Sequence, residues 1–309
     1  MLSRIAESLF WIGRYVERAD DTARILDVQT QLLIEDPSID ESASCNQLLA
    51  VMGVEGYEGN PRRADIMRIL ASDPESPWSM LSSFAAARES ARRARETLST
   101  DMWEAINTTW RAIPSGRVRH MRAPDLFGWV RERSAIITGI ADSTMSRDEG
   151  WLFLVLGRSI ERVDMTARLL STAALSDGPK VAWPTTLRAA GAYEAFLRTY
   201  RGLEADRDAA EFLLLDRLFP RSIVSALTRA ERSLENLEPT GRRAGFTDEA
   251  LRLLGRARAE LEYRPLADVV YDLPVEMERL QRGCSAATDA ITNRYFSSAV
   301  PMSWLGGVR

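Results

Sequence analysis

Residues 9–26 read LFWIGRYVERADDTARIL, and the spacing of their apolar side chains decides which fold we expect. At about 100° per residue, the apolar side chains gather on one face of a helix and the charged side chains on the other. The pattern continues in both directions and predicts one amphipathic helix from about Ser3 to Glu35, which stops before Pro37.

The rest of the chain repeats this helical spacing, and no alternating, β-branched strand pattern is evident. We therefore expect an all-α fold, a multi-helix bundle. A proline or a capping residue at Pro77, Pro124, Pro184, Pro220 or Asp248 marks several helix starts. The further helical stretches are Trp78–Leu98, Met102–Ile113, Pro124–Ser143, Trp151–Leu175, Pro184–Tyr200, Ala209–Leu218, Pro220–Leu237, Asp248–Tyr263 and Leu266–Tyr295.

The composition of the 309 residues excludes several classes of catalytic site. The single histidine, His120, rules out zinc sites built from several histidines and the paired Glu-x-x-His ligands of di-iron bundles. We interpret His120 as a surface residue and expect no metal and no cofactor. Cys45 and Cys284 lie far apart, which indicates two structural thiols in a reducing compartment.

The charge balance argues against a nucleic-acid partner, because 40 basic residues face 44 acidic ones and the net charge is -4. Two local basic segments, Arg88–Arg95 and Arg111–Arg122, are interpreted as solvated surface, with a phosphate or acidic-peptide contact as the alternative. We see no signal-peptide pattern and no apolar run near the roughly 20 residues that cross a bilayer. The expected location is therefore cytoplasmic, with no membrane partner.

An internal duplication is the strongest signal in the chain. Residues 13–26, GRYVERADDTARIL, and residues 157–170, GRSIERVDMTARLL, are identical at nine of fourteen positions with an offset of 144. Pro77, Ser79 and Ser82 match Pro220, Ser222 and Ser225 at an offset of 143. We expect one domain over residues 1–309 with two helical repeats, about 1–144 and about 145–309, related by a pseudo-twofold axis.

The duplication also repeats the polar face, which a helix is usually free to vary. Asp21 departs from this, because Met165 stands at its place in the second copy. Gly13 and Gly157 sit inside the two helices and indicate close helix packing. The candidate site is the polar seam formed by the repeated charged residues Arg14, Glu17, Arg18, Asp20 and Arg24 with Arg158, Glu161, Arg162, Asp164 and Arg168.

Three interpretations of this polar seam stay open. It is a solvated face left over from duplication, or a structural polar core, or a binding or reaction pocket. In a structural core, arginines of one copy form forked hydrogen bonds to carboxylates of the other. In a pocket, the arginines hold a carboxylate or phosphate ligand, and a carboxylate among them acts as a base.

The N-terminal residues MLSRIAESLFWIGRYVERADDTARIL resemble the bacterial alpha-E family, a helical domain of unknown function with a Glu-Arg motif. The motif here is Glu17-Arg18, with Glu161-Arg162 in the second copy. Weaker resemblances lie at residues 79–82, 102–107 and 183–194. The resemblance implies that the protein is encoded beside, or fused to, an ATP-grasp ligase-like protein and a transglutaminase-like protein.

Two functional hypotheses follow from the seam and the resemblance. The first is a non-catalytic helical partner, or a substrate-presenting component, of a peptide or amide ligase system. The second is an enzyme in which Glu17 or Glu161 acts as acid or base on a carboxylate- or amide-bearing peptide or metabolite. A second copy of the chain remains a further candidate partner.

Overall fold

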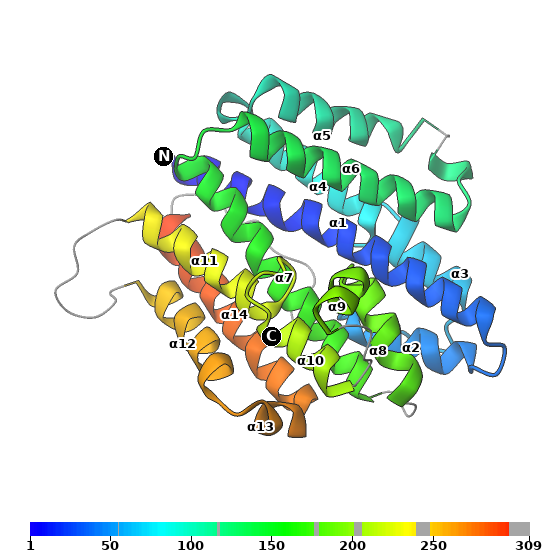
Figure 1. Cartoon of the computed structure of the whole chain (residues 1–309). Helices are drawn as coiled ribbons and strands as arrows, with labels where there is room; N and C mark the ends of the chain where they lie inside the picture. The colour runs from blue at the N-terminus through cyan, green and yellow to red at the C-terminus, as the bar shows by residue number, and fades with distance from the viewer. Residues whose placement is uncertain (55, 116–117, 176–178, 201–205, 239–247, 297–309) are drawn as a thin grey trace. The chain divides into compact units, whose positions relative to one another are not determined.

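The computed structural model describes residues 1–54, 56–115, 118–175, 179–200, 206–238 and 248–296. Every regular element among them is helical, which confirms the expected all-α fold (Figure 1). None of the helices in these ranges is both long and apolar enough to span a membrane.

The chain divides into two compact units, which we describe separately. Of the residues that the structure describes, those within 1–14 and 147–296 form the first unit and those within 15–146 form the second. The division falls within α1 (Ser3–Glu35), whose bounds are those that the sequence predicts.

The first unit is organised around α7 (Glu149–Leu175). Helices α11 (Ile223–Leu237) and α14 (Leu273–Tyr295) pack against α7, and α12 (Glu249–Tyr263) packs against both of them (Figure 1). The rings of Phe10, Phe153 and Phe296 meet in its core, with ring centroids 5.6 Å apart for Phe10 and Phe296. Four shorter helices complete the unit: α8 (Pro179–Ala189), α9 (Tyr193–Tyr200), α10 (Asp206–Leu215) and α13 (Leu266–Tyr271).

The second unit contains residues 15–35 of α1 and the helices that lie between α1 and α7 in the chain. Its longer helices are α4 (Met80–Arg93), α5 (Thr100–Ala112) and α6 (Ala123–Thr144), and α5 packs between the other two. The Ser134 hydroxyl of α6 donates to the carbonyl oxygen of Val16 in α1 at 3.4 Å. The shorter elements are α2 (Glu41–Val51), α3 (Arg63–Ile66), the π-helical turn η1 (Met67–Ser72), and the 3₁₀ turns η2 (Arg95–Thr97) and η3 (Val118–His120).

Serine and aspartate side chains cap several helices, which fixes where those helices begin. The hydroxyl oxygens of Ser79 and Ser222 accept from amides three residues on, at 3.3 and 3.2 Å, at the starts of α4 and α11. Helix α4 therefore begins at Met80 and α11 at Ile223, slightly later than the starts at Trp78 and Pro220 that the sequence predicts. At α12 the predicted cap, Asp248, accepts from the Leu251 amide at 2.8 Å.

Three predicted helices are interrupted. The stretch Trp78–Leu98 ends as an α-helix at Arg93 and passes into the 3₁₀ turn η2, and the other two break where the backbone leaves the helical conformation. The stretch from Pro184 to Tyr200 is divided at Gly191, whose φ of 63° lies in the left-handed region that ends helices. The stretch from Leu266 divides at Asp272, which has φ -134° and ψ 61°. Pro184 lies inside α8 instead of starting a helix.

Gly13 and Gly157 lie where α1 and α7 cross within the first unit. A Cβ atom at Gly13 would stand 2.1 Å from the carbonyl oxygen of Leu154, and one at Gly157 would stand 2.0 Å from that of Phe10. Both obstacles are backbone atoms, which cannot swing aside as a side chain does. Only glycine allows the two helices to approach this closely.

Replacing Gly157 by alanine should lower the free energy of unfolding by about 2 kcal/mol, because the added methyl forces the helices apart. At Gly139, on the exposed side of α6, no atom lies within 4 Å of an added Cβ. There the same change should raise the free energy of unfolding by about 0.5–1 kcal/mol through helix propensity alone. Urea unfolding of the two variants measures both effects, and stabilisation by Gly157→Ala would contradict the close approach.

Candidate functional site

The most buried part of the polar seam is an ion pair between α1 and α7. The Nε of Arg14 donates to Oε2 of Glu161 at 2.6 Å, and the two side chains are only 9% and 1% exposed. The guanidinium carbon of Arg14 also lies 5.3 Å from the ring of Trp11 and 6.0 Å from that of Phe10. Because a buried guanidinium without a counter-charge is strongly disfavoured, Arg14 requires Glu161 here.

The same intrahelical ion pair occurs in both copies of the repeated motif. Arg24 Nε donates to Asp20 Oδ2 at 3.0 Å in α1, and Arg168 Nε donates to Asp164 Oδ2 at 2.9 Å in α7. In each pair the acid lies four residues before the base, the favourable order on a helix. The carboxylate of Asp164 also accepts from the side-chain amide of Gln281 in α14 at 3.1 Å.

Three other seam arginines are placed differently from one another. Arg18 is buried, with its guanidinium carbon 5.9 Å from the ring of Tyr15, and Arg158 is buried on α7. Arg162 is half-buried and donates from Nη1 to the carbonyl oxygen of Pro220 at 3.4 Å. Together with Thr166, whose hydroxyl donates to the carbonyl of Arg221 at 3.0 Å, it holds the loop before α11.

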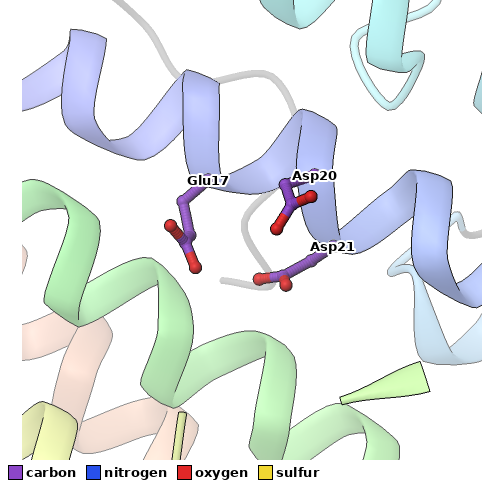
Figure 2. A group of neighbouring side chains, drawn as sticks. All are labelled: Glu17, Asp20 and Asp21. Atoms are coloured by element: carbon purple, nitrogen blue, oxygen red, sulfur yellow. The ribbon is translucent and has the colours of Figure 1, made fainter. Parts of the chain in front are cut away.

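Glu17 lies in a cluster of three buried carboxylates on α1 (Figure 2). Glu17, Asp20 and Asp21 extend from the same side of the helix, and each offers a carboxylate oxygen within 4.8 Å of those of the other two. Carboxylate oxygens are the ligands that hard cations such as Mg²⁺ and Ca²⁺ prefer. These three residues are the ones in the described part of the chain that could hold a metal ion.

Asp21 is not among the predicted seam residues, because Met165 replaces it in the second copy. Comparing the two copies of the repeated motif finds only the residues that both copies share, so it cannot find a carboxylate that is present in one copy alone. The i, i+3, i+4 spacing of Glu17, Asp20 and Asp21 is the signal that could have found the cluster, since those positions lie on one helix face.

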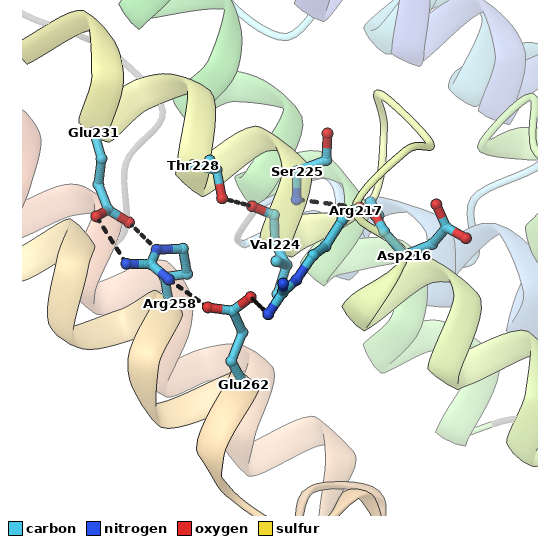
Figure 3. A network of polar contacts seen from close by, with 9 residues as sticks. Asp216, Arg217, Val224, Ser225, Thr228, Glu231, Arg258 and Glu262 are labelled. Carbon is cyan, nitrogen blue, oxygen red and sulfur yellow. Dashed lines mark hydrogen bonds and ion pairs between the residues drawn. The ribbon is translucent and has the colours of Figure 1, made fainter.

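A second polar network, absent from the predicted site, joins α11 to α12 in the first unit (Figure 3). Arg258 donates to both carboxylate oxygens of Glu231, from Nε at 2.6 Å and from Nη2 at 3.3 Å, and it also bonds Glu262. Glu262 pairs in turn with Arg217 at 2.8 Å. The hydrogen bond to Glu231 is the main reason that the pKa of Arg258 is raised. Its forked geometry fixes the two helices against each other.

The two cysteines offer no activated nucleophile. His120 is exposed in η3. Burial raises the pKa of the Cys284 thiol to about 12, where Asp164 adds to the effect and Arg14 opposes it. Burial likewise raises the pKa of Cys45 to about 11, with a smaller contribution from Glu41. Both thiols are free and buried, and both are protonated near neutral pH.

Glu161→Gln should lower the free energy of unfolding by about 3–5 kcal/mol, because it leaves the buried guanidinium of Arg14 without its counter-charge. Glu278→Gln removes the same charge from an ion pair with Arg282 in which both side chains are more than half exposed. That control should change the free energy of unfolding by less than about 0.5 kcal/mol. Similar urea midpoints for the two variants would show that the seam pair is not buried.

An aromatic disulfide reagent should leave both thiols unmodified in the folded chain at about pH 8 and modify both in denaturant, because they are buried and protonated. The raised pKa values also link stability to pH. The folded state holds these protons more tightly than the unfolded state, so this contribution is complete below the ordinary thiol pKa of 9.0 and is lost as the pH rises toward 11 and 12. Rapid modification of the native chain would contradict the thiol assignment.

Comparisons with known proteins place the chain in a family. Uncharacterized proteins of Mycobacterium bovis and Mycobacterium tuberculosis are 29% identical to it over 262 residues, which cover 76% of this chain. The match covers only 30% of the length of those curated relatives. No solved structure matches with statistical significance. The profile of a predicted α-helical domain with a conserved ER motif matches residues 1–296, and the chain therefore belongs to the Alpha-E family.

Proposed function

We propose that the chain is a non-catalytic helical component of a peptide or amide ligase system. In this role it docks an ATP-grasp ligase-like protein or presents that enzyme's substrate. The observation that carries the proposal is the buried ion pair of Arg14 and Glu161, in which the arginine is already bound to a protein carboxylate. A seam of this kind gives a helical body a fixed shape for a partner to recognise.

The remaining contacts of the seam support a structural role over a substrate pocket. Arg24 and Arg168 each bond an aspartate of their own helix, and Arg162 bonds a backbone carbonyl. A pocket for an anionic substrate instead requires guanidinium groups that face solvent and await a ligand. The seam arginines with these contacts already have protein oxygens as partners.

We also propose that the domain consists of two repeats, residues 1–144 and 145–309, related by a pseudo-twofold axis. The contacts at the helix crossing support this relation, because they are reciprocal. Gly13 meets Leu154 and Gly157 meets Phe10, and the offset of 144 exchanges one contact for the other. A twofold axis generates such swapped pairs. The equivalent serine caps at Ser79 and Ser222 support it further.

The partners in this proposal are an ATP-grasp ligase-like protein and a transglutaminase-like protein, in the cytoplasm. The resemblance to the alpha-E family is the basis for naming them. The length of the mycobacterial relatives is compatible with joint action, since 70% of each lies outside the match, which covers 30%. Those relatives therefore carry further polypeptide in the same chain as the helical region.

The alternative is an enzyme acting on a carboxylate- or amide-bearing substrate, and the carboxylate cluster is the observation that favours it. Glu17, Asp20 and Asp21 gather buried carboxylate oxygens, which is unusual for groups that repel one another. In such an enzyme Glu17 serves as acid or base. Glu17→Gln separates the two functions: a structural role predicts loss of stability, whereas a catalytic role predicts a folded, inactive protein.

Affinity purification of the tagged chain from its native host should recover an ATP-grasp ligase-like protein, identified by mass spectrometry. The exposed-pair variant Glu278→Gln should recover it equally, and Glu161→Gln should recover less because the helical body is loosened. Recovery of no ATP-grasp protein by the folded wild-type chain would contradict the proposal. Conversion of a peptide or amide substrate by the purified chain alone would establish the enzyme instead.

A further inference from the structure

Arginine and tryptophan side chains gather on the outer part of α4, η2 and α5 in the second unit. We call this group the arginine–tryptophan surface, and none of its members belongs to the polar seam. It lies at the end of α4, where the chain turns through η2 into α5. Its members are Arg88, Arg92, Arg93, Arg95, Trp103 and Trp110.

Two guanidinium groups of this surface lie against indole rings. The guanidinium carbon of Arg88 is 4.5 Å from the ring centroid of Trp110 and 5.9 Å from that of Trp103. The guanidinium carbon of Arg95 is 5.3 Å from the ring of Trp103. The guanidinium carbons of Arg88 and Arg95 both lie near the ring of Trp103, so the distance between them cannot exceed the sum of 5.9 and 5.3 Å. One short ligand can therefore reach both.

Among the described residues, neither arginine donates a hydrogen bond to a protein carboxylate, although Arg88 lies in an ion pair with Glu89 at 3.7 Å. The Nε of Arg88 is buried and has no hydrogen-bond partner, and the carboxylate of Glu89 is 3.7 Å from its Nη1, beyond hydrogen-bonding distance. Within the described residues, Arg95 forms no ion pair. A guanidinium stacked on an aromatic ring keeps its N–H groups in its own plane, where they can bind a carboxylate in a fork.

Three arginines of this surface gather around one carboxylate, that of Glu89. Arg92 binds the Glu89 carboxylate through Nε and Nη2, the shortest contact being 2.8 Å, and Arg93 lies 3.7 Å from it. The hydrogen bond from Arg92 is the main reason that the pKa of Glu89 is lowered. Glu89 is therefore a single anion among three guanidinium groups. The positive excess is confined to this cluster, because Glu96, Asp101 and Glu104 together with Glu89 balance the four arginines over residues 88–104.

Helix electrostatics explain only part of this arrangement. Arg92 and Arg93 lie in the last turn of α4, where cations are favoured by the helix dipole. Arg95 lies beyond the end of α4, and Arg88 lies more than a turn before it. The dipole does not account for their stacking on Trp103 and Trp110, which orients both guanidinium groups.

We propose that the arginine–tryptophan surface binds an acidic peptide segment of a partner protein, with Arg88 and Arg95 each holding a carboxylate of an Asp or Glu side chain. The complementary charge and the forked donors favour carboxylates. Arg88 lies over the ring of Trp110, and Arg88 and Arg95 lie over that of Trp103, so each indole that could stack on a nucleobase already has a guanidinium over it. The proposal does not depend on the proposed function, because it uses no seam residue.

Fluorescence anisotropy of a labelled peptide of about ten glutamates, titrated with the full chain at low salt, tests this binding. Arg88→Gln/Arg95→Gln should weaken binding by about tenfold, the equivalent of losing two charge-assisted contacts. The matched control, Arg256→Gln/Arg282→Gln, removes the same charge from exposed ion pairs of the first unit and should stay within about twofold of wild type.

Glu89→Gln gives the decisive contrast, because it removes the anion that competes with the peptide. We expect it to tighten binding by about threefold, a gain that unfolding cannot produce. Equal affinities for wild type and the Arg88/Arg95 variant, an equal loss in the control, or unchanged binding in Glu89→Gln would each overturn the proposal. Tighter binding of single-stranded DNA of the same length than of the peptide would overturn it as well.

Discussion

The ion pair between Arg14 and Glu161 imposes the strictest condition on this structure. Two charges that are almost fully removed from water must meet within hydrogen-bonding distance, and here Nε and Oε2 lie 2.6 Å apart. The condition fixes both the rotation of α7 and its position along the first turns of α1. Gly13 and Gly157 make it attainable, because backbone meets backbone at the crossing and the side chains need not span a wider gap.

Burial of this kind separates the seam from an ordinary helix surface. The exposed pair of Arg282 with Glu278 contributes little to stability, since water solvates either charge when the pair opens. The seam pair is shielded from water, so removing Glu161 leaves the charge of Arg14 in an apolar setting beside Phe10 and Trp11. A network of this type favours one helix arrangement over its neighbours more than it raises the total stability. That property suits the docking role proposed for this protein.

Sequence periodicity is sufficient to predict the long helices, because their buried stripes are wide and continuous. Ser3–Glu35 for α1 is the same in sequence and structure. Periodicity cannot locate breaks caused by a single backbone conformation, such as Gly191 at φ 63°, because the apolar spacing continues through them. Periodicity does not predict α2 either, because its buried residues, Cys45, Leu48 and Leu49, are too few to make a clear apolar stripe.

The candidate site likewise contains some contacts that the sequence predicts and others that it does not. Spacing alone places Asp20 beside Arg24 and Asp164 beside Arg168, and the structure has both pairs bonded. Asp21 and the Glu231–Arg258 network were missed, because a comparison of two repeats reports only what both share. The stacking of Arg88 and Arg95 on Trp103 depends on how α4 and α5 pack, which the basic composition of that segment does not reveal.

The most direct test of the inward-facing seam is a double-mutant cycle on Arg14→Leu and Glu161→Gln, read by urea unfolding. A buried, mutually dependent pair predicts a coupling free energy of about 2 kcal/mol or more, with the double variant far more stable than the two single losses together would suggest. Losses that add to within about 0.5 kcal/mol would contradict the account, because they would show that the two charges do not depend on each other.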